Sequence, residues 1–167
     1  MDFDPTYNYS KTDLTIDSNL VCWKFAELIK SLVTLSESAG RQMEIIGIGA
    51  TCDEMALDFD NYFTLEFETY FNNGLLTVGQ ISMLKDLDAY LDKRSGDKSP
   101  DFWDDFILET NPEWEEVRLK ARSILVDIGM QDLTLEFDRE EQYEMTDKGK
   151  RITMQLTKTR LVRQLPS

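Results

Sequence analysis

The chain has 167 residues, with 18 Lys and Arg against 32 Asp and Glu and a formal net charge of −14. That balance excludes a general nucleic-acid binder and a protein of anionic membrane surfaces, because both need cations opposite phosphates. Nine Phe, six Tyr and three Trp need burying, which excludes a disordered acidic tail and fits one globular domain.

The first residues are polar and acidic. Residues 1–17 predict an irregular N-terminal arm or a short strand rather than a secretory signal. No apolar stretch approaches the roughly 20 residues of a membrane span, which indicates a cytoplasmic protein. We expect two free, buried thiols at Cys22 and Cys52, as in a reducing compartment, although a disulfide is geometrically possible.

Helical spacing of apolar residues begins after this arm. A first helix is predicted from near Ser18, a good cap type, as far as Leu35. Residues 36–52 fit either a helix end or a short buried strand, because glycines interrupt the apolar segment MEIIGIGA. A clearer helix is predicted over 53–71, whose aromatic and apolar i, i+4 row is Met55, Phe59, Phe63, Phe67 and Phe71.

Local stop and start signals define the next elements. The triplet Asn72-Asn73-Gly74 ends the preceding helix, and Thr77 with Gln80 makes a capping box for a helix that runs to about Lys93. Residues 94–100 read as a loop, and a short helix then carries Phe102, Trp103 and Phe106. A last helix starts at Asn111 and Pro112 and ends at Gly129, with a regular apolar stripe between them.

The period of the pattern changes after Gly129. Apolar and polar residues alternate around Leu133, Leu135 and Phe137 and again around Ile152, Met154 and Leu156. This predicts a hairpin of residues 132–145 and 150–162, which must pack on the helices or pair with the N-terminal arm or the MEIIGI segment. Six basic residues from Lys148 onward are expected to pair with the acidic helical body.

These elements predict an α+β fold in a single domain over residues 1–167. An N-terminal arm (1–17) precedes a mostly helical body (18–129), and a C-terminal antiparallel β-hairpin or small sheet (132–162) follows it.

The sequence offers little for catalysis. It has no histidine, so the commonest general base, nucleophile activator and metal ligand is missing. Gly47-Ile48-Gly49 begins like a dinucleotide fingerprint, but Cys52 stands where the third glycine belongs. Paired carboxylates are the remaining enzymatic route. We therefore predict a protein that is not an enzyme, with no cofactor and no metal site.

Carboxylates and aromatic residues lie interleaved in two parts of the helical body. Such anchors ringed by charge are typical of tight interfaces, where aromatic groups supply affinity and charges supply association rate. The alternative is that Trp103 and Trp114 are core residues and that the carboxylates only solvate the surface. The candidate partner-binding residues are Asp58, Asp60, Asp101, Trp103, Asp104, Asp105, Glu109, Glu113 and Glu116.

The pieces DFDNYF, FWDD and PEWEEVR, within residues 57–91, 99–106 and 111–129, also carry a family resemblance. They resemble bacterial immunity proteins encoded beside polymorphic or contact-dependent growth inhibition toxins, over about half the chain. The resemblance transfers no individual functional residue. Where such a protein opposes a nuclease toxin, it implies that acidic side chains cover a cationic nucleic-acid site.

Charge and resemblance together predict an immunity protein that neutralises a cognate basic toxin, with no nucleic-acid or membrane partner. An acidic nucleic-acid mimic that inhibits a DNA- or RNA-binding protein is one alternative, and it requires carboxylates along a phosphate-like track. A small carboxylate-dependent hydrolase is another, and it requires a concave pocket with a carboxyl of raised pKa. A structural or adaptor module is the third.

Overall fold

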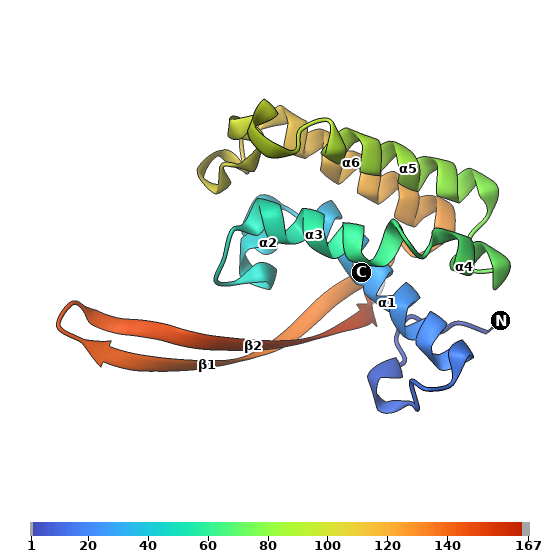
Figure 1. Ribbon diagram of the computed structural model, residues 1–167, viewed down its shortest axis with the longest axis horizontal. Coiled ribbons are helices and arrows are strands. Elements are labelled where there is room, and N and C mark those ends of the chain that lie inside the picture. The colour runs from blue at the N-terminus through green and yellow to red at the C-terminus, as the bar shows by residue number, and fades with distance from the viewer. Residues whose placement is uncertain (1, 165–167) are drawn as a thin grey trace.

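The computed structural model describes residues 2–164, which form six α-helices, four short 3-10 helices and one two-stranded antiparallel sheet (Figure 1). The fold is α+β in a single domain, as predicted. The α-helices are α1 (Asp17–Ser36), α2 (Ala39–Ile46), α3 (Thr51–Phe63), α4 (Phe67–Asn72), α5 (Val78–Asp92) and α6 (Pro112–Ile128). Strands β1 (Leu133–Thr146) and β2 (Gly149–Arg163) form what we call the hairpin arm, residues 133–163, which projects beyond the helices (Figure 1).

Helix α1 runs through the centre of the helical body and packs against α2, α3, α6 and β1. Eleven of its residues are buried. The helix begins at Asp17, next to the predicted start near Ser18, but its N-cap is Ile16, which makes no side-chain cap, so the capping role of Ser18 is wrong. Burial of the whole apolar face sets this start, and the Asp17 carboxylate suits the positive end of the helix dipole.

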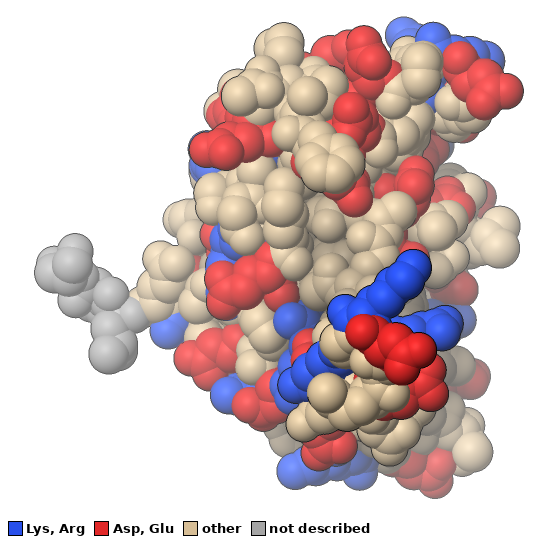
Figure 2. All heavy atoms as spheres, turned by 90° about the vertical axis from the view of Figure 1, so that its left-hand side faces the viewer, with Lys and Arg blue, Asp and Glu red and all other residues tan. Residues whose placement is uncertain are grey.

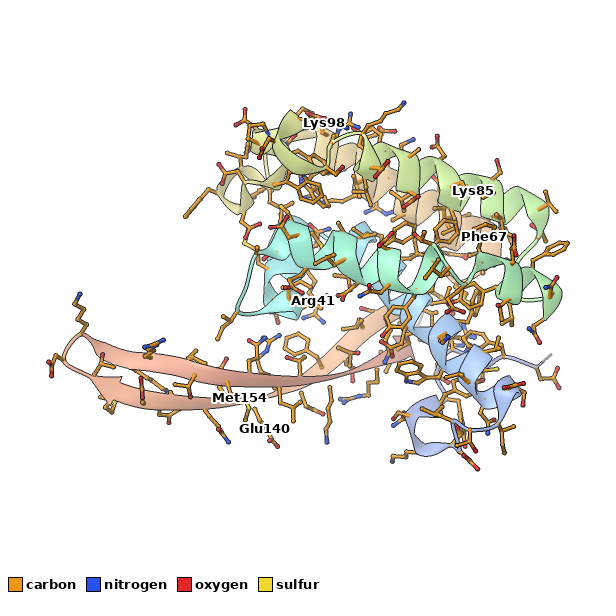
Figure 3. All side chains as sticks on the ribbon, viewed as in Figure 1. Arg41, Phe67, Lys85, Lys98, Glu140 and Met154 are labelled. Atoms are coloured by element: carbon orange, nitrogen blue, oxygen red, sulfur yellow. The ribbon has the colours of Figure 1, made fainter. Side chains whose placement is uncertain are left out.

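The helix predicted over 53–71 is broken into α3 and α4 by a turn at residues 64–66. The break rotates the second half, so that Tyr70 is fully buried and Phe71 is 46% exposed. The Tyr70 hydroxyl donates to the Tyr62 carbonyl at 2.6 Å, which satisfies one carbonyl near the end of α3. Phe67 stays half-buried, with the Lys85 ammonium 4.5 Å from the centre of its ring (Figure 3). Tertiary packing therefore overrides the i, i+4 row beyond Phe63.

Within the ambiguous segment 36–52, residues 39–46 form helix α2, capped by Ser38, and no part of the segment is a strand. Its C-terminal end holds the hairpin arm through a polar clamp. The Arg139 guanidinium donates to the Glu44 and Ile45 carbonyls at 3.0 and 2.6 Å. The Gln155 amide donates to the Ile46 carbonyl and accepts the backbone N–H of residue 48. The hairpin thus packs on a helix end instead of gaining a third strand.

The remaining start and stop signals are confirmed. Thr77 and Gln80 form the reciprocal capping box of α5, and Asn111 caps α6 through the Glu113 N–H. Gly129 ends α6 in the left-handed conformation, with φ of 82°. Cys22 and Cys52 are both buried, and no disulfide joins them. Within residues 2–164, no helix is both long and apolar enough to cross a bilayer.

Only the base of the hairpin arm is buried. Leu133, Leu135 and Leu161 belong to the core, and Arg41 of α2 lies between the helices and the arm, 5.4 Å from the Phe137 ring centre (Figure 3). The predicted second apolar stripe, Ile152, Met154 and Leu156, is 37 to 51% exposed, because the strands outrun the helical body. The segment does form a strand, but the prediction that its apolar face is buried is wrong.

The basic C-terminal residues do not pair with the helical body as expected. Arg160 binds Glu136 and Asp138 across the sheet at 3.0 and 2.9 Å, and Arg151 lies 3.7 Å from Glu144. The hairpin register explains this pairing, because it places the basic strand β2 directly beside the acidic strand β1.

A substitution at Gly47 tests the clamp between α2 and the hairpin arm. The φ of Gly47 is +73°, and an added Cβ would collide with the Gln155 amide and the Arg139 guanidinium. We expect Gly47→Ala to lower the free energy of unfolding by about 1–3 kcal/mol, from backbone strain and loss of the clamp. The matched control is Gly40→Ala in the same helix, where nothing lies within 4 Å. In urea unfolding, equal stability of the two variants would contradict this role.

Candidate protein-binding site

A groove of about 710 Å³ lies between α3, α5 and the loop that follows α5. We call it the acidic groove. Helix α3 contributes one wall and the C-terminal half of α5 the other, while loop residues 95–103 close one end. Its lining residues are Asp53, Ala56, Leu57, Phe59, Asp60, Asp88, Leu91, Asp92, Ser95, Gly96, Asp97, Pro100 and Trp103.

The groove combines apolar lining residues with charged residues of one sign. Leu57 is 54% exposed, and the half-buried Trp103 indole also lines the groove. Among the described residues that line the groove, five are Asp and none is Lys or Arg. An exposed apolar surface ringed by carboxylates can bind a group that is both apolar and cationic, such as an Arg or Lys side chain with its aliphatic stem.

The aspartates are held close to one another at a cost in stability. Asp88 and Asp92 lie one turn apart on α5, where two like charges destabilise a helix. The pKa of Asp88 is raised, chiefly because burial disfavours the charged form and also because Asp60 and Asp92 repel it. A cationic ligand would relieve this repulsion, so the groove favours positive charge.

The end of the groove is held in place by packed aromatic rings. The Trp103 indole N–H donates to the Arg94 carbonyl at 2.5 Å. Phe102 stacks on the fully buried Trp114, with ring centres 4.6 Å apart. The Arg94 guanidinium lies over Tyr90, 3.6 Å from the ring centre, and forms an ion pair with Glu113. This packing gives Trp103 a fixed position, which suits an interface anchor.

The structure disperses the candidate residues predicted from the sequence. Asp60 and Trp103 line the acidic groove, and Asp101 is exposed on the turn between Pro100 and Trp103. Trp114 is in the core, the alternative considered for it. Asp58 lies in a different cleft.

The other predicted carboxylates have local structural partners. Asp104 accepts the Phe106 N–H at 2.9 Å, and Asp105 accepts the N–H groups of residues 51 and 52 at the start of α3. Glu113 pairs with Arg94, and Glu116 lies 3.7 Å from Lys120. Glu109 is exposed. Hydrogen bonds and ion pairs therefore occupy most of the predicted cluster.

Sequence reasoning missed four of the five groove aspartates, Asp53, Asp88, Asp92 and Asp97. A signal for two of them was present, because Asp88 and Asp92 form an unfavourable like-charge i, i+4 pair. That α3 and α5 lie side by side, however, is a tertiary fact that the helical pattern does not contain.

A second concave site, the hairpin cleft, lies under the hairpin arm with a volume of about 410 Å³. Its carboxylates are Glu27 of α1 and Glu54 and Asp58 of α3. The pKa of Asp58 is raised from 3.8 to about 6, first by burial and then by repulsion from Glu54 and Glu27. Asp58 is exposed by surface area, and the walls of the cleft reduce the water around its carboxyl.

Metal binding finds no support in the side-chain geometry. In the part of the chain that the structure describes, no three acidic or cysteine side chains are grouped as metal ligands would be.

The charge distribution differs between the helical body and the hairpin arm. Figure 2 views the molecule from the side on which the arm projects, with acidic side chains spread over the body and both signs mixed at the arm tip. Residues 133–163 hold seven Lys and Arg and six Asp and Glu, whereas the rest of the chain holds eleven and twenty-six. The negative field therefore belongs to the helical body and its groove.

Comparison with known proteins adds no relative. No family model matches the chain, and no curated protein or solved structure shows significant similarity to it.

Asp105 should act on stability rather than on binding. Its carboxylate caps α3 from a distant loop, with bonds of 2.9 and 3.0 Å to two orphan N–H groups. We expect Asp105→Ala to lower the free energy of unfolding by about 1–2 kcal/mol. The exposed neighbour Asp101 serves as the control, and Asp101→Ala should change stability by less than about 0.5 kcal/mol. Similar losses in both variants, measured by urea unfolding, would rule out the cap.

Asp58 should make stability depend on pH. Its pKa is about 6 in the folded protein and returns toward 3.8 on unfolding, so the folded state binds the proton more tightly. The free energy of unfolding should therefore rise as the pH falls through 6 toward 4. Asp58→Asn should be more stable than the wild type at neutral pH and should lose this rise. Asp127→Asn, an exposed change on α6, should keep the wild-type profile.

Proposed function

We propose that the chain is an immunity-type inhibitor that binds a basic bacterial toxin in the cytoplasm and covers the cationic active-site surface of that toxin. The acidic groove carries this proposal. Its lining combines five aspartates with apolar side chains, and no cation competes with a ligand among the described lining residues. The resemblance of residues 57–91, 99–106 and 111–129 to immunity proteins agrees with this reading.

Binding would occur in two stages. The negative field of the helical body first steers the basic partner and raises the association rate. Cationic side chains then enter the acidic groove, where Leu57 and Trp103 exclude water and contact their aliphatic stems. Inhibition by occlusion requires no chemistry from this chain.

A nucleic-acid mimic is the less suitable alternative. A phosphate-like track would need carboxylates at regular intervals along a line. The groove aspartates instead line a single hollow together with apolar side chains, which fits a protein side chain.

A carboxylate-dependent hydrolase remains the second candidate, because one specific observation favours it. Asp58 combines a pKa of about 6 with a place in the hairpin cleft, which is what a general acid requires. Burial, together with the neighbouring carboxylates, accounts for the same pKa shift without catalysis. A hydrolytic activity of the purified chain that disappears in Asp58→Asn would favour this candidate over inhibition.

The acidic groove is tested by a triple variant, Asp60→Asn with Asp88→Asn and Asp92→Asn. The proposed partner, a basic toxin encoded by the gene beside this one, is the ligand in the test, and protection is measured as growth during co-expression with that toxin. For the purified pair, we expect the association rate at low salt to fall about tenfold, with a weaker dependence on salt.

The control carries the same change in net charge at exposed carboxylates outside the groove: Asp2→Asn, Glu68→Gln and Asp127→Asn. We expect it to protect cells and to lower the association rate less than about threefold, because the groove charges are retained. A wild-type chain that neither binds nor neutralises this toxin would refute the proposed function. Equal effects of the two triple variants would remove the groove from it.

A further inference from the structure

The hairpin arm continues well past its attachment to the body. The clamp to α2 is made by Arg139 and Gln155. Beyond it, each strand runs on for about six or seven residues, or roughly 23 Å. Figure 1 shows this part of the arm standing clear of the helices. A two-stranded hairpin has marginal stability in water unless another element packs on it. The part of the arm beyond the clamp, residues 140–154, which we call the free half, therefore needs an explanation.

A β-bulge determines on which face of the sheet the exposed apolar side chains of the free half lie. The register shifts between Gln142 and Tyr143, so that Tyr143 pairs with Ile152. Residues paired across an antiparallel sheet share a face, which places Ile152 with Tyr143 and Met145 on the face that carries Arg139. Without the bulge, Ile152 would share the opposite face with Met154. The bulge therefore gathers an apolar group on one face.

We call this group of Tyr143, Met145 and Ile152 the inner patch. Its members are 53, 77 and 37% exposed, and the Lys150 ammonium of the same face lies 3.5 Å from the centre of the Tyr143 ring. Arg139 of the same face reaches α2, so the inner patch lies on the side of the arm turned toward the helices. Met154 lies on the opposite face with Glu140 (Figure 3).

The net charge of the arm neither attracts nor strongly repels the partner proposed for the groove. Its residues 133–163 are nearly neutral, so they do not repel a basic protein, whereas the acidic body repels a second copy of this chain. The arm and the loop that closes the acidic groove both lie at the left of Figure 1. A stable complex buries about 800 Å² on each partner, which is more than one groove supplies.

We infer that the hairpin arm is a clasp: a basic toxin seated in the acidic groove also lies against the inner patch, which supplies apolar anchors. The inference rests on the proposed function. Long-range charge sets the association rate, and apolar anchors set the lifetime of a complex. The groove should therefore govern association and the inner patch dissociation.

The test compares two variants of the same arm. The inner-patch variant carries Tyr143→Thr, Met145→Thr and Ile152→Thr, since threonine keeps the strand propensity. The outer-face control carries Met154→Thr and Leu156→Thr, whose side chains are each 51% exposed. Dissociation of the complex with the neighbouring toxin should be about 10- to 100-fold faster for the inner-patch variant. Its association rate should change less than about twofold, and the control should dissociate less than about threefold faster.

Hydrogen exchange of the wild-type complex gives an independent measurement. Backbone amides of residues 140–154 should become protected when the toxin binds. One set of results would overturn the clasp alone. In it, the toxin binds the wild-type chain and the groove variant binds it more weakly, but the inner-patch variant dissociates at the wild-type rate and the arm amides stay unprotected. A wild-type chain that does not bind the toxin would overturn the proposed function itself. A dimer of the free chain that the inner-patch variant dissociates would assign the patch to a second copy and also overturn the clasp.

Discussion

A buried hydrogen-bond network around Gln42 of α2 is the constraint on which the rest of the structure depends. Gln42 is fully buried, and its amide donates to the Thr34 and Leu35 carbonyls at the end of α1. Its oxygen accepts from the guanidinium of Arg118 in α6, which also donates to the Leu108 carbonyl at 2.8 Å. A buried cation without such partners would cost several kcal/mol, so α1, α2 and α6 are locked together.

Both proposed binding elements are connected to this network through short segments. The linker that supplies the Leu108 carbonyl also carries Asp105, which caps α3 and so positions one wall of the acidic groove. At the other end of α2, Gly47 leaves room for Arg139 and Gln155 to hold the hairpin arm. One eight-residue helix therefore relates the groove to the arm. A partner that contacts both would meet a pre-organised surface, which limits the entropy lost on binding.

Part of the candidate site could be predicted from the sequence and part could not. The excess of acidic residues predicts a strongly negative surface, and five aspartates do line the groove. Asp60 and Trp103 were named, but Asp104, Asp105 and Glu113 turn out to make caps and an ion pair. A carboxylate that caps a helix from 54 residues away is indistinguishable, in the sequence, from one that faces solvent. Which carboxylates stay available for a partner depends on those distant contacts.

The sequence by itself determined the elements whose signals are local: the Thr77 capping box, the Asn111 cap, the end of α6 at Gly129 and the existence of the C-terminal hairpin. Such signals involve residues within one helical turn or one tight turn, so short spacing suffices to read them. Only the tertiary structure decided that 36–52 forms a helix, that 53–71 breaks, and that the hairpin arm leaves the body. Those outcomes follow from which faces find a partner to pack against, and that depends on residues far apart in the chain.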